Sequence, residues 1–165
     1  MRVLLYFFLP TIFIVGCGQP DLDVPDLDDL QTLNKITAEA IDYKNLQQKG
    51  EKREKLFYAP NKQKPYTGWA RLTRDNGSLI GIFQIKDGKR GGLELMCYKD
   101  GKRESVGIMK EDEEGVISLK VWKPNGEKCP ISKIENGNGV LVVYNDDGTE
   151  KHRLTYKDGW PDLWD

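Results

Sequence analysis

Three cysteines and a single histidine are the side chains of this sequence best suited to nucleophilic or metal chemistry. A structural zinc site takes four nitrogen or sulfur ligands, and Cys97, Cys129 and His152 are too few and too widely spaced to supply them. His152 stands among charged residues in the strand-like segment 150–154, where a solvated strand position accounts for it better than a catalytic base does. We therefore predict no metal site and no hydrolytic triad.

Carboxylates and glycine pairs offer further chemistry. The acidic run 111–114 lacks the alternating ligand spacing of a calcium loop, and the acids of segment 145–148 belong to an Asn-Asp-Asp-Gly turn. A glycosidase needs a defined pair of acids, and the sequence selects none. Segments 91–92 and 136–139 lack the strand-to-helix setting of a phosphate loop. We predict a non-catalytic protein without a cofactor, and an envelope enzyme acting on glycans or peptides is the least favoured alternative.

Cys17 has a different context, because it follows a secretory-type segment. One basic residue, Arg2, precedes an apolar run over residues 3–15, which is too short for a transmembrane helix of about 20 residues. The four residues that end this segment resemble the lipobox of bacterial lipoproteins: Ile14, Val15, Gly16 and Cys17. The resemblance implies that residues 1–16 are a signal peptide and that Cys17 is lipidated.

The mature chain would be weakly acidic. Cleavage removes one of 25 Lys and Arg residues against 26 Asp and Glu, so the net charge changes from −1 to −2. Nucleic-acid-binding domains commonly have an isoelectric point above about 9, whereas the value for this chain is about 5.9. We expect no nucleic-acid partner. In the lipoproteins that this segment resembles, the residues just after the cysteine influence sorting. Gly18 is not an inner-membrane retention acid, so in a Gram-negative source the resemblance implies a lipid anchor in the outer membrane, facing the periplasm.

Two elements separate the anchor from the rest of the chain. Residues 17–28 form an acidic, proline-containing tether, a composition that resists packing. Residues 29–44 are predicted to form an amphipathic helix, with Asp28 and Gln31 as a capping box. The polar face is mainly acidic, which favours docking on the protein's own sheet over a membrane surface. The apolar stripe consists of Leu30, Leu33, Ile36, Ala40 and Ile41.

In residues 45–165 the apolar residues follow a strand-like period in place of a helical one, and Asn-Gly and Asp-Gly pairs separate the strand-like segments. Such pairs favour type I′ turns and therefore predict hairpins. Four of the turn glycines recur at intervals of 24, 25 and 22 residues, which makes the segment a repeat. The repeat-turn glycines are Gly77, Gly88, Gly101, Gly126, Gly137, Gly148 and Gly159.

Two columns of the repeat are expected to bury one face of the sheet. The first column is Ile85, Met109, Ile134 and Tyr156, and the second is Thr73, Cys97, Trp122 and Tyr144. The repeat places Cys97 and Cys129 two strands apart, beyond disulfide reach. We predict two buried thiols.

The segments Lys-Asp-Gly-Lys-x-x-Gly at 86–92, Tyr-Lys-Asp-Gly-Lys at 98–102, Trp-Lys-Pro-Asn-Gly at 122–126 and Tyr-Lys-Asp-Gly at 156–159 resemble the MORN repeat variant. This variant is found in proteins labelled antitoxin components of the YwqK family. The likeness covers roughly residues 56–160 and implies repeated hairpins. It also implies an alternative function, an antitoxin or immunity protein of a toxin-antitoxin pair.

Aromatic residues are the remaining candidates for binding. Tyr66, Trp69, Trp160 and Trp164 are speculative binding residues, although core packing and a cap on the last strand are alternative roles. The sequence therefore predicts a mainly β protein, an elongated, twisted antiparallel meander of repeated hairpins with one N-terminal helix. We expect a membrane-anchored binding or scaffold lipoprotein of the cell envelope with an unknown protein partner.

Overall fold

The computed structural model describes residues 25, 27, 29–51, 55–111 and 115–162. The predicted signal peptide, Ile14, Val15, Gly16, Cys17 and Trp164 lie outside the described residues, as does almost all of the tether. The prediction that the tether resists packing was wrong at Leu27, which is buried in the core of the sheet. Among the described helices, none is long and apolar enough to cross a membrane.

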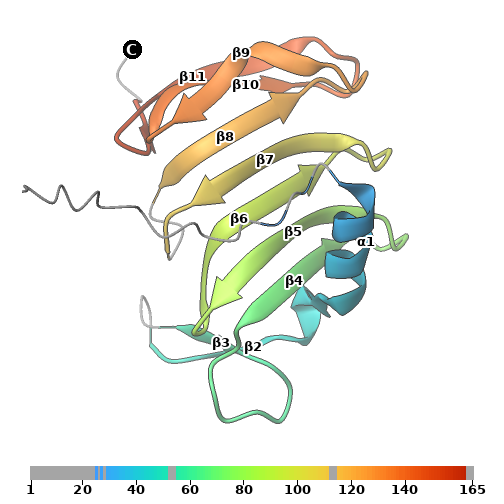
Figure 1. The fold of residues 1–165 in the computed structure, drawn as a ribbon, viewed down its shortest axis with the longest axis vertical. Coiled ribbons are helices and arrows are strands. Elements are labelled where there is room, and N and C mark those ends of the chain that lie inside the picture. Colours follow the sequence, from blue (N-terminus) through green and yellow to red (C-terminus); the bar gives the residue numbers. More distant parts are fainter. Residues whose placement is uncertain (1–24, 26, 28, 52–54, 112–114, 163–165) are drawn as a thin grey trace, which may run out of the picture.

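The protein is mainly β, as predicted, and in the described part of the chain ten strands form one sheet (Figure 1). From β4 to β12 consecutive strands are antiparallel neighbours, which confirms the meander. Its strands are β4 (Gly68–Thr73), β5 (Leu79–Lys86), β6 (Lys89–Cys97), β7 (Arg103–Met109), β8 (Val116–Trp122), β9 (Lys128–Glu135), β10 (Asn138–Tyr144), β11 (Glu150–Lys157) and β12 (Trp160–Pro161).

Three short strands precede the meander. β1 (Ile41–Asp42) pairs with β4 in parallel and forms one edge of the sheet, whereas β2 (Gln47–Lys49) and β3 (Leu56–Tyr58) form a separate antiparallel pair. A 3-10 turn, η1 (Tyr43–Asn45), joins β1 to β2. The parallel β1–β4 pair departs from the predicted all-antiparallel arrangement.

The N-terminal helix is α1 (Leu30–Glu39), which is shorter than the predicted range of 29–44. Asp29 is the N-cap, and its carboxylate accepts a hydrogen bond from the backbone N–H of Thr32 at 2.8 Å. The predicted cap, Asp28, lies outside the described residues. The helix docks on the sheet, as expected, because Ile36 is buried there and the Thr37 carbonyl accepts from Arg71 Nη1 at 2.9 Å.

The prediction for the end of the helix was wrong. Ala40 has extended backbone angles, φ −64° and ψ 131°, and the next two residues pair with Ala70 and Arg71 of β4. Ile41 fits the helical stripe but packs with Ala70 and Phe83 on the face of the sheet opposite to the helix. Strand pairing and burial therefore override the local helical pattern, and the chain passes around the β4 edge from one face to the other.

The turns fall into two classes, one at each end of the strands. Asp87, Asn136 and Asp158 have positive φ angles together with the glycine that follows each of them, as a two-residue type I′ turn requires. In the second class only the glycine of each Asn-Gly or Asp-Gly pair has a positive φ angle. These glycines are Gly77, Gly101, Gly126 and Gly148.

In this second class the Asn or Asp has another role. The Asn76 side chain accepts a hydrogen bond from Ser78 N at 3.0 Å, and Gly77 N donates to the Arg74 carbonyl at 2.9 Å. Asp100, Asn125 and Asp147 accept in the same way from the residue two positions later. The type I′ prediction was therefore wrong for these four turns, because the side chain stabilises a longer loop instead.

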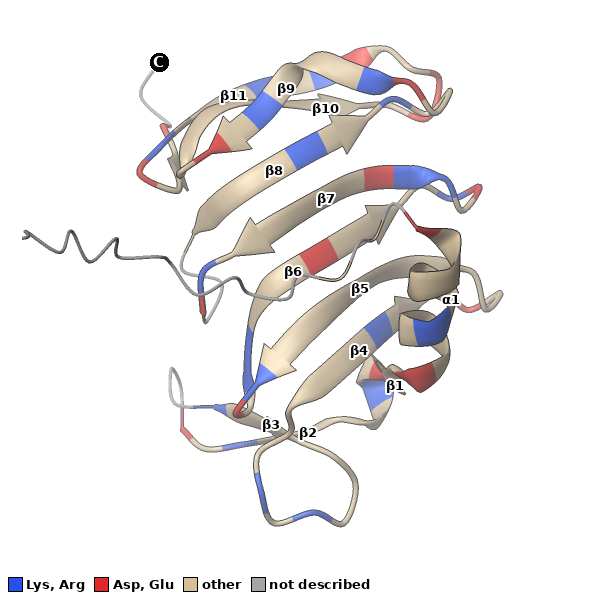
Figure 2. Cartoon of the chain, viewed as in Figure 1, with Lys and Arg blue, Asp and Glu red and all other residues tan. Residues whose placement is uncertain are grey.

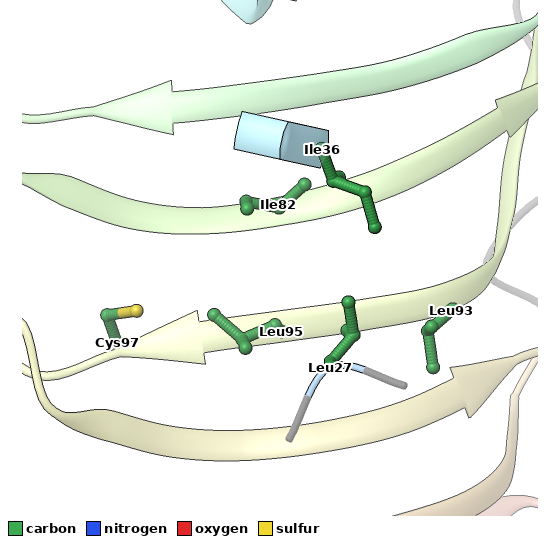
Figure 3. Packing of buried hydrophobic residues seen from close by; sticks show 6 residues of the cluster. All are labelled: Leu27, Ile36, Ile82, Leu93, Leu95 and Cys97. Carbon is green, nitrogen blue, oxygen red and sulfur yellow. The ribbon is translucent and has the colours of Figure 1, made fainter. Parts of the chain in front are cut away.

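The helix and the sheet share the helix-side cluster, which consists of Leu27, Ile36, Ile82, Leu93, Leu95 and Cys97 (Figure 3). Ala70, Phe83 and Ile85 form the opposite-face cluster under η1 and β3. Further along the chain, Val121, Cys129 and Val142 form the C-terminal cluster. The core is therefore distributed along the sheet rather than concentrated in one layer.

Bulges separate residues that the repeat columns group together. The register shifts next to Thr73, Cys97 and Tyr144, immediately before or after the longer turns. As a result Cys97 packs in the helix-side cluster whereas Tyr144 packs against the C-terminal cluster. The second column therefore does not bury one face, because a bulge changes the direction of the side chains that follow it.

Both described cysteines are buried and unpaired, as predicted. Cys97 lies in β6 and Cys129 in β9, and β7 and β8 lie between these strands in the sheet. The separation is therefore three strand spacings rather than the predicted two, which places a disulfide further out of reach.

Candidate binding groove

A row of cross-strand partners shows that the C-terminal half of the sheet curls. Each residue in the row is paired with the next across neighbouring strands, so all of these positions belong to one face of the sheet. The row is Phe83, Glu94, Gly107, Leu119, Ile134, Gly139 and Tyr156. In a flat sheet, Glu94 on β6 and Tyr156 on β11 would stand about 24 Å apart, at ~4.8 Å per strand. Both instead line one groove, so this face is concave.

Backbone hydrogen bonds hold the curl at one end of the strands. Gly137 N donates to the Ile117 carbonyl, Gly159 N to the Gly137 carbonyl and Val116 N to the Gly159 carbonyl, at 2.8, 2.8 and 2.9 Å. The last bond joins β8 directly to the turn after β11, three strands further in the sheet order. Lys110 Nζ adds a bond to the Asp158 carbonyl at 3.1 Å. These bonds close the C-terminal hairpins onto β8.

The groove inside the curl measures about 180 Å³. Residues of β6, β7 and β8 form one wall of the groove, and residues of β10 and β11 form the other. β10 and β11 lie next to each other at the C-terminal end of the sheet (Figure 1). The lining is mainly apolar, with three tyrosines and two carboxylates. It consists of Glu94, Tyr98, Glu104, Ser105, Met109, Val116, Leu119, Val121, Leu141, Val142, Val143, Tyr144 and Tyr156.

Among the described residues that line the groove, Glu94 and Glu104 carry charge and both are acidic. Acidic positions lie within β6 and β7, among the mixed charges of the whole sheet (Figure 2). Glu94 forms an ion pair with Arg90 at 2.7 Å, whereas no ion pair or hydrogen bond joins the Glu104 side chain to another described residue. Glu104 is therefore the acidic group that a ligand could use.

Burial raises the pKa of the Glu104 carboxyl above its usual value, and the charge of Arg74 opposes this effect only in part. Arg74 is itself engaged, because its guanidinium donates to the carbonyls of Leu79 at 2.6 Å and Cys97 at 3.1 Å. Asp146 adds a further negative charge near Glu104. A cation entering the groove would stabilise the charged form of Glu104 and so offset the cost of its burial.

The tyrosine hydroxyls of the groove are neutral at physiological pH. Burial first, and the charge of Glu104 second, raise the pKa of Tyr98 to about 12. Burial and the contact with Cys129 raise the pKa of Tyr144 to about 12. Tyr98 donates to the Trp122 carbonyl at 2.7 Å, and the Tyr144 hydroxyl lies 2.9 Å from the Cys129 sulfur. These contacts hold the two rings in fixed positions as parts of the groove wall.

The structure does not group the side chains of the three described aromatic candidates. Tyr66 packs against the opposite-face cluster and donates from its hydroxyl to the Trp69 carbonyl at 2.9 Å. Trp69 packs against the helix-side cluster, on the other face of the sheet. Trp160 is 55% exposed on β12, at the far edge. Tyr66 and Trp69 therefore contribute to packing, and Trp160 alone of these three is freely accessible.

The turn glycines differ in their surroundings. A Cβ atom would meet nothing within 4 Å at Gly77, Gly101, Gly126 and Gly148. At Gly88, Gly137 and Gly159 it would lie 2.8, 2.6 and 3.0 Å from a neighbouring segment. Gly88 belongs to a second ring of backbone hydrogen bonds, with Phe57 and Tyr66, that resembles the ring around Gly137. The tight turns are therefore packing points as well as chain reversals.

His152 and Glu111, which were considered for catalysis, do not line the groove. His152 is exposed on β11, and residues 112–114 of the acidic run lie outside the described residues. Among the described residues, no three His, Cys, Asp or Glu side chains are grouped so that they could hold a metal ion.

Sequence reasoning missed the two groove carboxylates. It assigned Met109, Tyr144 and Tyr156 to packing columns, and all three line the groove. Glu104 follows a turn and resembles any solvated strand residue, so the sequence gives no signal that it faces a cavity. Only the curl of the sheet brings it opposite β10 and β11.

The fold defines this chain as a mainly β, antiparallel hairpin-repeat protein with a concave C-terminal face. Comparisons with family models, curated proteins and solved structures found no match. The likeness to the MORN repeat variant remains a prediction from the residues.

Proposed function

We propose that this chain is a membrane-anchored, non-catalytic binding module of the cell envelope. In this proposal Cys17 carries the lipid, the residues between Cys17 and Leu27 act as the spacer, and the hairpin repeat presents its concave face to a protein partner. Leu27 itself is anchored in the helix-side cluster. The observation that carries the proposal is the groove of about 180 Å³, with apolar walls and a half-buried carboxylate that has no partner among the described residues.

The construction of the groove supports binding to a protein. Sites for small organic ligands commonly measure about 300–1,000 Å³, so this groove is better matched to a single side chain of a larger partner. Protein interfaces often centre on one anchor side chain that fills a pocket. The backbone bonds around Gly137 and Gly159 preform the concavity, which lowers the entropic cost of binding.

Site-specific photo-crosslinking tests the proposal. A photoreactive amino acid replaces Ser105, which lines the groove, in the full-length chain expressed in its own cells. The control replaces Asn125, an exposed residue of a turn. We expect a discrete adduct from the groove position and none from the control. Equal labelling at both positions, or no adduct from a folded groove variant, would contradict a binding role for this face.

The repeat resemblance supports a second candidate function, an antitoxin or immunity protein that neutralises a toxin by direct binding. The two functions differ in the partner rather than in the surface. A toxin-like reading frame beside this gene, whose product forms the groove adduct, would favour the second function. An adduct with an unrelated envelope protein would favour the first.

An envelope enzyme acting on glycans or peptides is the third candidate. Replacing His152 and the acidic run 111–114 tests it directly. Loss of an envelope hydrolase activity in these variants would favour the enzyme and contradict the binding proposal.

A further inference from the structure

We propose that the groove receives the basic side chain of a lysine or arginine from the partner polypeptide, with its charged group at the Glu104 carboxylate. The inference rests on the proposed binding function and specifies which kind of partner side chain the groove binds. Two features of the groove support it: its charge and its walls.

The charge of the lining is complementary to a cation. Both charged residues that line the groove in the described chain are acidic, and Glu94 is already paired with Arg90 at 2.7 Å. Glu104 has no such pair within the described residues, whereas the nearby Asp146 is paired with Lys99 at 2.9 Å. A carboxylate in an apolar setting forms strong charge-assisted hydrogen bonds with ammonium or guanidinium groups.

The walls are complementary to the stem of the same side chain. Met109, Leu119, Val121 and Leu141 provide apolar surface for a chain of methylene groups. Lys and Arg commonly bury this stem while the charged end remains at a polar site. The rings of Tyr98, Tyr144 and Tyr156 also line the groove, and aromatic rings attract cations at close range. A purely apolar side chain would leave the Glu104 carboxylate without a partner, and an acidic side chain would be repelled by it.

A larger cavity in the described part of the chain lacks this complementarity. It measures about 370 Å³ and lies between α1 and β4. Its charges are of both signs and already engaged: Lys44 pairs with Asp42 at 3.5 Å, and Arg71 donates to the Thr37 carbonyl. Of these two cavities, the groove is therefore the one whose charge favours binding of an added cation.

The test uses n-butylammonium as the probe, because it has the stem and charge of a lysine side chain. The full-length chain, purified in detergent, carries ¹³C-methyl methionine. Met109 lines the groove, whereas Met96 lies against Gly81 of β5 outside the lining. We expect n-butylammonium to shift the Met109 signal to saturation and to move Met96 much less. Sodium chloride at equal ionic strength and n-butanol are the matched controls.

Two variants give the decisive comparison. Glu104→Gln keeps the size of the side chain and removes its charge, and Glu135→Gln does the same at an exposed position on β9. We expect Glu104→Gln to weaken n-butylammonium binding about tenfold and Glu135→Gln to leave it unchanged. No saturable shift of Met109, an equal shift with n-butanol, or equal affinity in Glu104→Gln would overturn the inference.

The crosslinking experiment separates this inference from the proposed function. A groove adduct whose yield falls in Glu104→Gln but not in Glu135→Gln supports both. An adduct of unchanged yield in Glu104→Gln keeps the binding function and overturns the cationic anchor. If the wild type gives no adduct, the proposed function fails, and the n-butylammonium titration still decides the chemistry of the groove.

Discussion

Two turn glycines of the repeat, Gly137 and Gly148, have similar backbone angles but different neighbours. Their φ angles are 79° and 86°, so a side chain at either position is strained. At Gly137 a Cβ atom would in addition lie 2.6 Å from the backbone nitrogen of Gly159, whereas at Gly148 it would meet nothing within 4 Å. In the sequence both are the second residue of an Asn-Gly or Asp-Gly pair, yet only Gly137 takes part in the hydrogen bonds that hold the curled hairpins together.

This difference predicts unequal costs of the same substitution. We expect Gly148→Ala to lower the free energy of unfolding by about 1 kcal/mol, the cost of a left-handed alanine. Gly137→Ala should cost roughly 3 kcal/mol or more, because the methyl group also displaces the ring of backbone hydrogen bonds. Urea denaturation of both variants measures the difference. Equal losses would mean that the ring does not hold the hairpins.

Glu104 is expected to make stability depend on pH. Because burial raises its pKa in the folded state, the folded chain binds this proton more tightly than the unfolded chain does. Stability therefore falls as pH rises from the ordinary value of 4.5 through the raised pKa, and the full penalty is reached above the raised pKa.

Removing this charge should stabilise the protein at neutral pH. We expect Glu104→Gln to raise the free energy of unfolding at pH 7 by on the order of 0.5 kcal/mol, given solvent screening of a half-exposed group. The gain should vanish below about pH 4, where the wild-type carboxyl is protonated in both states. Denaturation at pH 4 and pH 7 measures it, with Glu135→Gln as the control. A variant that is less stable at pH 7 would show that the charge has a stabilising partner.

At the scale of elements, α1 depends on one buried side chain. Ile36 is 6% exposed beneath the helix, beside Ile82 and Leu95 (Figure 3). Leu30 belongs to the same predicted stripe but is 69% exposed. The helical period alone does not distinguish the two residues, because the tilt of the helix on the sheet decides which part of the stripe is covered.

The same substitution should therefore have different effects in the helix. We expect Ile36→Ala to lower the free energy of unfolding by about 2–4 kcal/mol through lost burial and a cavity. Leu30→Ala should change it by less than about 0.5 kcal/mol, as a surface substitution. Thermal or urea denaturation compares the two. Similar losses would indicate that the helix packs more deeply than its exposed first turn implies.

At the scale of the whole molecule, the proposed function joins an anchor to a preformed surface. The sheet carries its core in clusters along its length, so each hairpin relies mainly on its neighbours. The curled end with the groove lies far along the chain from Cys17. This arrangement suits a module that is held at a membrane and presents its concave face to a partner.

The anchor predicts a change of location. We expect Cys17→Ser to release the protein from the membrane fraction, because the thiol that would be acylated is lost. Cys97→Ser, at a buried thiol in β6, serves as the control and should stay with the membrane. Cell fractionation and immunoblotting provide the measurement. Membrane retention of Cys17→Ser would contradict lipid anchoring.

The sequence by itself determined the features that depend on neighbouring residues. Alternating strand patterns and Asn-Gly or Asp-Gly pairs predicted the hairpins, and the apolar stripe predicted one helix on the sheet. Backbone preference and side-chain period act over a few residues, so they can be read directly from the chain. The same rules could not distinguish the two turn classes, because Asn and Asp serve either class.

Only the tertiary structure decided the end of the helix, the curl and the groove. Ile41 leaves the helical pattern because β4 offers it strand partners and burial. Glu104 and Tyr156 face one cavity because bulges and the ring at Gly137 fold distant strands together. Such contacts join residues about 50 positions apart, and their free energy depends on the whole sheet rather than on local preference.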